Sequence, residues 1–396
     1  MIIEYSLNKV MDFLNLNSWK AIKTEDLQGM YDQEKLSLAR KYQQEKEQVS
    51  LISSTLNLIV MLVLMFSGAY AWLDNLLRQY TQNEMILSVL FFGFLGFCTS
   101  GMHLPFQMYN TFVIEEKYGF NKTTPATFVK DLFVGMVLSS VVGGGLLMLL
   151  TWIYGFTHSW FWLLAWLAVS GTSIFFAMFY TSWILPLFNK MTPLGDGTLR
   201  DGISELVAKT GFPMQKVMVM DGSKRSSKAN AFFSGLGFKK TIVLYDTLIE
   251  SMSEDEVLAV LAHEIGHYKR GHVYRSLVIS LFNAAIMFFI FGIVAGSNAI
   301  PNSLHTLPSF HVSLLVFGMM YSPVGMIMNT VGNLVSRKHE YEADAFAKSQ
   351  GLGNYLISSL KKLNTNHLSN PLPHPWYEFL HYSHPSVLKR IKALQE

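Results

Sequence analysis

Two histidines and a glutamate in one short stretch are the residues best suited to do chemistry in this chain. His263, Glu264 and His267 form the pattern HExxH within LAHEIGHYKRGH, residues 261–272. On a helix, residues four apart share one face, so both imidazoles can bind one metal ion. The carboxylate after the first histidine can then act as general base toward a water, as in zinc metallopeptidases. The same five-residue pattern also occurs by chance on polar helix faces, so the interpretation requires a third ligand.

A second acidic pair supplies candidates for that ligand. Glu340 and Asp344 follow the last long apolar stretch and, at four residues apart, share one helix face. A downstream helix with a ligand Glu and an Asp one turn later is the thermolysin-like arrangement. We therefore predict one Zn²⁺ per chain, bound by His263, His267 and Glu340, with Asp344 orienting the His263 ring. The alternative is a solvated, charged helix face.

Two neighbouring residues compete for the role of third ligand. His272 lies five residues past His267, roughly 140° around a continuous helix, and is expected to point away from the metal. Glu342 lies on the other side of its helix from Glu340. Neither is predicted to be a ligand.

The composition places these residues in a membrane protein. Half of the 396 residues are hydrophobic and only 15% are charged, with 29 Phe, 21 Met and 8 Trp. Such values are typical of membrane proteins. The net charge of +3 gives no indication of nucleic-acid binding. The one cysteine, Cys98, excludes an intrachain disulfide and a cysteine-based metal cluster.

Long stretches without charge predict six transmembrane helices, since a span needs about 20 apolar residues. The expected spans are residues 49–73, 85–109, 132–154, 160–185, 273–296 and 312–336. An even number of spans puts both termini on one side. Of 31 Lys and Arg residues, only Arg78 falls in a loop on the opposite side. By the positive-inside rule, the termini, the 110–131 loop and the HExxH motif are expected to be cytoplasmic.

The spans divide the chain into five parts. The expected parts are a polar N-terminal segment that is helical from about residue 24 (1–48), spans one to four (49–187), a cytoplasmic zinc-metallopeptidase domain (188–272), spans five and six (273–336) and a cytoplasmic C-terminal part of that domain (337–396). The fold class is mostly α, with a small α+β catalytic domain of the gluzincin type.

The catalytic domain has recognisable local signals. Residues 199–210 are expected to form a helix that ends at Gly211, and residues 216–220, 230–234 and 241–245 to form strands, the last two joined by a turn at 235–237. Ser253 and Glu256 form a capping box that opens the HExxH helix. Because Gly271 is the one breaker before the fifth span, we expect this helix to run directly into the membrane.

Several motifs together make the chain resemble a known family. HEIGHYKRGH (263–272), EYEADAFAKS (340–349) and residues 110–124, 222–249 and 381–394 are similar to the type I CAAX prenyl endopeptidases, which are integral-membrane zinc metallopeptidases. The resemblance extends over most of the chain from about residue 31, with the motifs in the family's order. It implies a membrane helical barrel around a water-filled chamber. It also implies, as in eukaryotic members, removal of three residues from a prenylated C-terminal Cys-aliphatic-aliphatic-X tail.

The resemblance also implies roles for residues that have ordinary interpretations on their own. His384, a surface histidine before proline, would help stabilise the tetrahedral oxyanion. Asn230 and Ala231 would begin a strand that pairs with the extended substrate, the edge-strand recognition mode. Arg390, otherwise a helix-surface cation, would hold the site or the polar end of the substrate.

One departure from the family bears on the expected function. Eukaryotic members begin with an additional transmembrane helix, whereas residues 6–23 are too short and too charged to span. Either six helices close the barrel or the chain has a shortened start. This difference and the lack of an endoplasmic-reticulum signal favour a bacterial inner membrane, with the endoplasmic reticulum membrane as alternative.

The sequence thus predicts a zinc-dependent membrane endopeptidase of the CAAX prenyl protease type. Its expected partners are the lipid bilayer and a membrane-associated, possibly prenylated, peptide or protein, and no nucleic acid. One alternative is a quality-control metallopeptidase for membrane proteins without prenyl specificity. A remote alternative is a transporter with structural zinc, which the lack of charged residues in the middle of the spans argues against.

Overall fold

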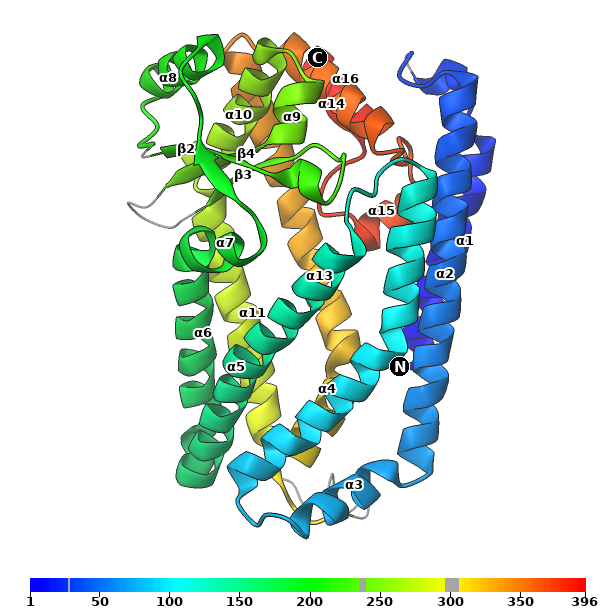
Figure 1. Cartoon of the computed structure of the whole chain (residues 1–396), viewed down its shortest axis with the longest axis vertical. Coiled ribbons are helices and arrows are strands. Elements are labelled where there is room, and N and C mark those ends of the chain that lie inside the picture. The colour runs from blue at the N-terminus through cyan, green and yellow to red at the C-terminus, as the bar shows by residue number, and fades with distance from the viewer. Residues whose placement is uncertain (28, 215, 235–239, 296–305) are drawn as a thin grey trace.

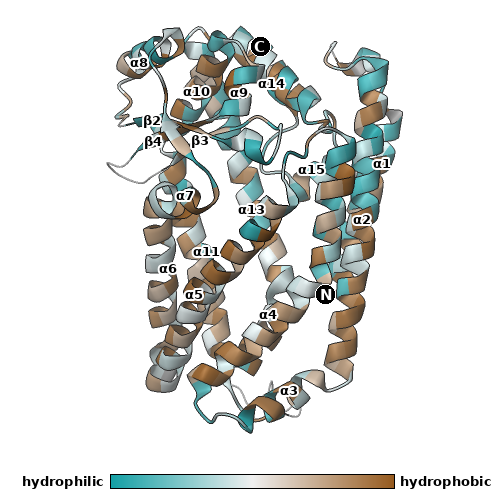
Figure 2. Ribbon diagram, in the orientation of Figure 1, coloured by the Kyte–Doolittle hydropathy of each residue, from teal (hydrophilic) through white to brown (hydrophobic). Residues whose placement is uncertain are grey.

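The computed structural model describes residues 1–396 except 28, 215, 235–239 and 296–305. Within the described residues, six helices are long and apolar enough to cross a membrane. They run along the length of the molecule (Figure 1), and Figure 2 shows them as mainly hydrophobic, in contrast to the end that carries the sheet. The six are α2 (Gln33–Phe66), α4 (Glu84–Tyr109, continued by a π-helical turn Asn110–Glu115), α5 (Pro125–Thr157), α6 (Phe161–Phe179, continued through Tyr180–Ile184 to α7, Leu185–Phe188), α11 (His272–Ala295) and α13 (Phe310–Ser349).

Contacts between these helices close a ring. They run from α4 through α5, α6, α11 and α13 and back to α4, while α2 packs against α4. The expected membrane helical barrel is therefore the architecture of the described residues. Helix α1 (Ile2–Ala21) is not among the six and lies along α2, where the Tyr5 hydroxyl is 2.5 Å from Thr55 Oγ1.

The N-terminal elements differ from the sequence-based expectation. Residues 33–48 of the expected polar segment and the expected first span from residue 49 belong to one uninterrupted helix, α2, whose N-cap is Asp32. Earlier residues of that segment form α1, before the helix start expected at about residue 24. Helix α2 ends at Phe66 rather than at residue 73 because Gly68 adopts a left-handed conformation with φ of 73°. Helix α3 (Ala69–Arg78) then lies across the end of the barrel opposite the sheet (Figure 1).

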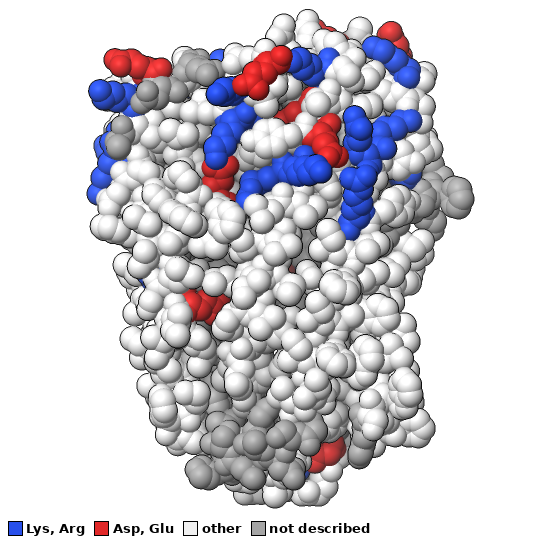
Figure 3. Space-filling view, turned by 180° about the vertical axis from the view of Figure 1, so that it is seen from behind, with Lys and Arg blue, Asp and Glu red and all other residues white. Residues whose placement is uncertain are grey.

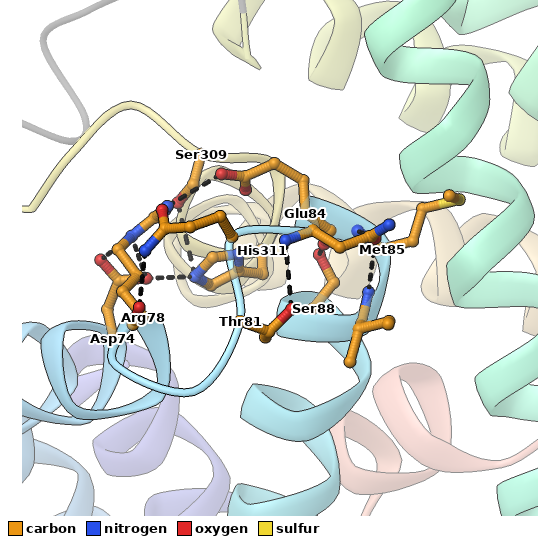
Figure 4. A network of polar contacts seen from close by, with 11 residues as sticks. Asp74, Arg78, Thr81, Glu84, Met85, Ser88, Ser309 and His311 are labelled. Atoms are coloured by element: carbon orange, nitrogen blue, oxygen red, sulfur yellow. Dashed lines mark hydrogen bonds and ion pairs between the residues drawn. The ribbon is translucent and has the colours of Figure 1, made fainter.

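A polar network ties α3 to the first turns of α4 and α13 at this far end (Figure 4). Asp74 is fully buried, and its Oδ1 lies 2.8 Å from His311 Nε2. Arg78 Nε donates to both Asp74 oxygens at 3.2 and 3.0 Å, and its Nη1 donates to Glu84 at 2.8 Å. Through α3, these contacts join α4 to α13, which are neighbours in the ring, at this end.

The opposite end is a cap of short helices around a four-stranded sheet. The strands β1 (Met191–Pro193), β2 (Lys216–Met220), β3 (Ala231–Ser234) and β4 (Thr241–Tyr245) have the order β1-β2-β4-β3. Strands β2 and β4 are parallel, whereas β1–β2 and β3–β4 are antiparallel. The three expected strands are present, β3 starting one residue later than expected, and the expected turn at 235–237 lies outside the described residues. Strand β1 was not predicted, because its three residues are too few to show a strand pattern.

The cap helices are α8 (Thr198–Thr210), α9 (Asp246–Ser251), α10 (Glu254–Lys269), α14 (Gly353–Asn366), α15 (Pro375–His381) and α16 (Val387–Gln395). Helix α8 ends at Gly211 with φ of 59°, as expected from the glycine. Helix α10 carries the HExxH motif and contacts α8, α13 and α14. Its apolar side chains, Val257, Leu261 and Ile265, are buried in the core of the cap.

The expected run of α10 directly into the membrane is wrong. The helix ends at Lys269, Gly271 takes a left-handed φ of 68°, and α11 begins at His272 as a separate element. Glycine adopts this conformation without steric cost, which makes it the usual residue just past a helix C-terminus. The break changes where His272 points, with consequences for the site.

Candidate active site

Helices α10 and α13 place the ligand side chains side by side. The N-terminus of α10 is held by the expected capping box, in which the Glu256 carboxylate accepts from Ser253 N at 2.8 Å and Glu256 N donates to Ser253 Oγ at 3.4 Å. Deeper in the helix, a Cβ added at Gly266 would lie only 3.0 Å from the Ala343 Cα on α13. This glycine therefore allows the two ligand-bearing helices to approach closely at the level of the motif.

His263, His267 and Glu340 converge on one point. His267 Nε2 lies 3.2 Å from His263 Nε2 and 3.2 Å from Glu340 Oε1, and His263 Nε2 lies 3.5 Å from Glu340 Oε2. Two atoms bound to zinc at about 2.0–2.1 Å in tetrahedral geometry lie about 3.4 Å apart. The three side chains therefore fit a tetrahedral metal and leave a fourth position for another ligand.

An aspartate and an arginine hold the first of these ligands in place. Asp344 Oδ1 lies 2.8 Å from His263 Nδ1, so the proton of this ring belongs on Nδ1 and leaves Nε2 for a metal. Arg390 on α16 donates to both Asp344 oxygens, at 2.8 and 2.6 Å, and its Nη1 lies 3.2 Å from Glu340 Oε2. Burial acts to lower the pKa of Arg390, but hydrogen bonds and charge from Asp344 raise it. The guanidinium is thus a fixed positive charge behind the ligands.

The second histidine ligand has its own support, which the sequence-based reasoning missed. His267 Nδ1 lies 3.0 Å from His272 Nδ1, and His272 Nε2 lies 2.9 Å from Glu342 Oε2. With Nε2 of His267 kept for a metal, its Nδ1–H donates to His272, whose Nε2–H donates to Glu342. His272 was expected to point away from the metal, and it is not in the group of three that could bind one. Its contact with His267 was missed because a continuous helix was assumed. The break at Gly271 turns the ring back toward His267, and that glycine was the available signal.

Glu264 and His384 lie beside the ligand group on the side where a substrate has access. Burial raises the pKa of the Glu264 carboxyl above its ordinary value, and the Glu340 carboxylate adds to the rise. A raised pKa makes a carboxylate a more effective general base, because the best pKa for such a base lies near the operating pH. His384 has a side chain that is 63% exposed, and its Nδ1 lies 3.0 Å from Glu340 Oε2. The structure therefore places both residues next to the predicted metal position.

Two cavities meet at these residues. The membrane-side cavity, of about 620 Å³, is lined by Tyr180 after α6, Ser276 of α11 and Ser336 of α13. The cap-side cavity, of about 710 Å³, is lined by residues of α14, α16 and the segment before β3. Both include the same four residues of the site in their walls: His263, Glu264, Glu340 and His384. A chain that lies across the site can thus occupy both cavities at once.

Strand β3 runs along both cavities as the outer strand of the sheet. Phe232, Phe233 and Ser234 line the membrane-side cavity, whereas Asn230 and Ala231 line the cap-side cavity. Asn230 O accepts from Tyr245 N at 3.1 Å, so by the alternation of an antiparallel ladder the backbone of Ala231 faces the open edge. Asn230 Oδ1 accepts from Ala231 N at 2.8 Å.

Comparisons with known proteins cover nearly the whole chain. Residues 13–190 match the family model described as CAAX prenyl protease N-terminal, five membrane helices, and residues 193–396 match peptidase family M48. CAAX prenyl protease 1 homolog of Oryza sativa subsp. japonica is 33% identical, over 97% of this chain and 93% of that protein. CAAX prenyl protease 1 of Saccharomyces cerevisiae is 34% identical, over 93% of this chain and 87% of that protein.

A solved structure agrees with the fold. The crystal structure of Ste24p from S. mikatae superposes with a TM-score of 0.92 and 32% sequence identity, covering 99% of this chain and 96% of that chain. A ring of membrane helices with a metal-ligand group in its cap defines a membrane metalloendopeptidase. Within that class, the chain belongs to peptidase family M48, in the group of the CAAX prenyl proteases.

Proposed function

We propose that this chain is a zinc-dependent endopeptidase that removes the C-terminal three residues from prenylated CAAX substrates at the membrane surface. The observation that carries the proposal is the convergence of His263, His267 and Glu340 between two cavities, one of which is lined by residues of the membrane-spanning helices. The alternative of a quality-control peptidase has the same chemistry and differs in substrate.

In this proposal the ligands are His263, His267 and Glu340, with Asp344 and Arg390 fixing their orientation. Zinc bound there would supply the Lewis acidity that lowers the pKa of a water and polarises the scissile carbonyl. Glu264 accepts the proton of the attacking water and passes a proton to the leaving amine. His384, beside Glu340, donates a hydrogen bond to the oxyanion, which is the charge that develops in the transition state.

The edge of β3 binds the substrate backbone. Ala231 offers its carbonyl to an added strand, and the Asn230 amide group, whose Oδ1 is engaged by Ala231 N, offers its NH₂. The membrane-anchored part of the substrate occupies the membrane-side cavity, and the C-terminal part occupies the cap-side cavity. The two cavities therefore set the direction in which the chain is threaded.

We further propose that the cap faces the cytoplasm. Support comes from the distribution of charge: Lys and Arg side chains gather at the cap end in the view of Figure 3, and the far end carries Arg78. Positive charge accumulates on the cytoplasmic side of membrane proteins. The bacterial inner membrane, with the endoplasmic reticulum membrane as alternative, stays a prediction.

The test compares three substrates on the purified protein: a farnesylated CAAX peptide, its unprenylated twin and an unstructured protein, each with and without a zinc chelator. We expect release of a tripeptide from the farnesylated peptide, faster than from its twin, with loss on chelation and recovery on adding zinc. Equal rates on the two peptides would remove prenyl recognition, and preferred cleavage of the unstructured protein would favour the quality-control alternative.

A further inference from the structure

The cap-side cavity ends at a lysine whose position suits the terminus of a short peptide. Of the described residues that line this cavity, Lys228 and Arg390 are the lysine and arginine side chains. Arg390 is 8% exposed and is engaged by Asp344 and Glu340. Lys228 has a side chain that is 30% exposed and contacts neither the ligands nor Asp344 in the contacts between described residues. It is thus the cation of the cavity that is not engaged with the metal-ligand group, and its partners are Glu115 and Tyr42.

The chain is extended from Lys228 to the edge strand, and its hydrogen bonds alternate in direction. Lys228 O accepts from Thr247 Oγ1 at 3.0 Å and Asn230 O accepts from Tyr245 N at 3.1 Å, both on the side of the sheet. Ala229 N instead donates to His367 Nε2 at 3.1 Å, on the side of the open edge. The edge is therefore available at Ala231 and is blocked by His367 two residues earlier.

His367 blocks the edge as a neutral acceptor. Burial lowers the pKa of His367 to about 4, and the charge of Lys228 adds to the effect. A neutral imidazole can accept the Ala229 N–H, which an imidazolium cannot. A peptide strand that pairs with Ala231 therefore loses backbone pairing two residues further on, at Ala229.

This inference rests on the proposed function, which fixes how the substrate residues align with β3 and the residues before it. A prenylated residue stays near the membrane, so the substrate enters along Phe232–Ser234 and leaves along Asn230–Lys228, antiparallel to β3. With the residue before the scissile bond opposite Ala231, the next residue lies opposite Asn230. The last two residues reach the level of Ala229 and Lys228 without a backbone hydrogen bond to Ala229 N, which His367 already holds. Each residue advances a strand by about 3.3 Å, so both chains cover the same length.

From this register we propose that the cap-side cavity binds the C-terminal three residues of the substrate and that Lys228 binds their terminal carboxylate. The ammonium group has three N–H donors. Among the described residues, Glu115 Oε2 at 2.8 Å and Tyr42 OH at 2.9 Å take two of them, and the Phe120 ring centroid lies 4.3 Å from the ammonium, so the third donor has no oxygen acceptor. These two partners also fix the position of the ammonium, so that little side-chain freedom is lost on binding.

Charge balance around Lys228 also favours an anionic ligand. The nearby Lys46 Nζ lies 3.7 Å from Glu115 Oε1 and 3.3 Å from Tyr42 OH, so two lysines share one carboxylate. The Glu47 carboxylate also acts on Lys46, so Lys228 is the lysine of this pair that has only a share of one carboxylate. Lys46 does not appear among the described residues that line the cavity, which makes it the matched control.

The experiment measures kcat/KM for a farnesylated CAAX peptide with a C-terminal carboxylate and for the same peptide with a C-terminal amide. A hydrogen bond to a charged group contributes enough that the wild-type protein should prefer the acid by about tenfold or more. Lys228→Gln should bring this ratio close to one, and Lys228→Arg should retain most of it. Lys46→Gln removes a positive charge near Lys228 but no side chain that lines the cavity, so it should lower the ratio less than Lys228→Gln. Extending the peptide by two residues beyond the tripeptide should slow cleavage.

Several outcomes overturn the inference. These are equal cleavage of acid and amide by the wild-type protein, an unchanged ratio in Lys228→Gln, or an equal loss in Lys46→Gln. Inhibition of the wild-type protein by the free tripeptide acid and by its amide provides a test that needs no variant, and equal inhibition counts against Lys228. If the metal-loaded wild-type protein cleaves neither peptide, the proposed function itself fails, which is distinguishable from cleavage of both at one rate.

Discussion

A histidine lies 2.8 Å from an aspartate at both ends of the molecule: His263 with Asp344 in the cap and His311 with Asp74 at the far end. In the cap, the aspartate takes Nδ1, and Nε2 faces a second histidine and Glu340. At the far end, Nε2 itself contacts the aspartate, whose oxygens are also bonded to Arg78. In the cap, the second ring nitrogen meets other metal-ligating side chains. At the far end, the second nitrogen, His311 Nδ1, is buried with no hydrogen-bond partner among the described residues, and the contacts of Nε2 join helices.

The far end also shows why residue types alone do not define a catalytic site. Ser309, His311 and Asp74 have the composition of a serine-hydrolase triad. However, Ser309 Oγ, at 3.5 Å, and the Asp74 carboxylate both contact the same nitrogen, Nε2 (Figure 4). A triad needs the serine on one ring nitrogen and the aspartate on the other, so that a proton can pass through the ring. The function of a histidine paired with an aspartate is therefore decided by which ring nitrogen contacts the aspartate and by which side chains surround the second ring nitrogen.

The largest expected effect is a loss of turnover when the general base in the cap is replaced and the metal ligands are kept. Glu264→Gln keeps the shape of the side chain but loses the base. The turnover number should fall about 100-fold to 10,000-fold, since a positioned general base contributes that much. Peptide cleavage measured by mass spectrometry, with metal content determined on the same sample, checks this. Activity near that of the wild-type protein would remove Glu264 from the mechanism.

The next largest effect is expected on metal affinity, when the side chains that orient the two histidine ligands are replaced. Asp344→Asn removes the charge that orients His263 and binds Arg390, and metal affinity should fall about 10-fold to 100-fold. The metal concentration needed for half-maximal activity measures this. His272→Phe should act in the same direction through His267. Unchanged metal affinity in both variants would show that neither contact orients a ligand.

The matched change at the far end should affect stability and leave metal affinity alone. Asp74→Asn removes the buried negative charge that Arg78 and His311 contact, and breaking a buried ion pair costs about 3–5 kcal/mol. The melting temperature in detergent should fall, while zinc affinity and the turnover number of the folded protein should stay as in the wild type. A loss of metal affinity here would contradict the separation of the two clusters.

The smallest effect is expected at the exposed edge of the far-end network. Glu84 pairs with Arg78 at 2.8 Å, but its side chain is 47% exposed. Exposed ion pairs contribute about 0–1 kcal/mol, so Glu84→Gln should lower the melting temperature far less than Asp74→Asn. Equal losses in the two variants would mean that burial does not distinguish these contacts.

Local signals allowed part of this architecture to be predicted. Four long charge-free stretches, two of them long enough for two helices each, predicted the six membrane helices, and Ser253 with Glu256 predicted the start of α10. Helix periodicity placed Glu340 and Asp344 on one helix face, and the thermolysin-like arrangement of a downstream Glu and Asp related them to the HExxH motif. These features depend on residues close together in the chain, or on one periodic pattern.

Features that depend on distant residues were not accessible in this way. The far-end cluster joins Asp74 to His311, 237 residues apart, and neither lies in a recognisable motif. The contact between His272 and His267 depends on the left-handed φ of Gly271, and a single glycine in the sequence does not show whether the helix breaks there. Residues 42, 115 and 228 likewise come together only through the packing of α2 and α4 against the cap.

The most direct test of the central claim is cleavage of a farnesylated CAAX peptide by the purified protein, followed by mass spectrometry. The account predicts loss of the last three residues, abolished by a zinc chelator, restored by zinc, and absent in Glu264→Gln that retains its metal. Failure of the metal-loaded wild-type protein to release the tripeptide, or release that continues in metal-loaded Glu264→Gln, would contradict it.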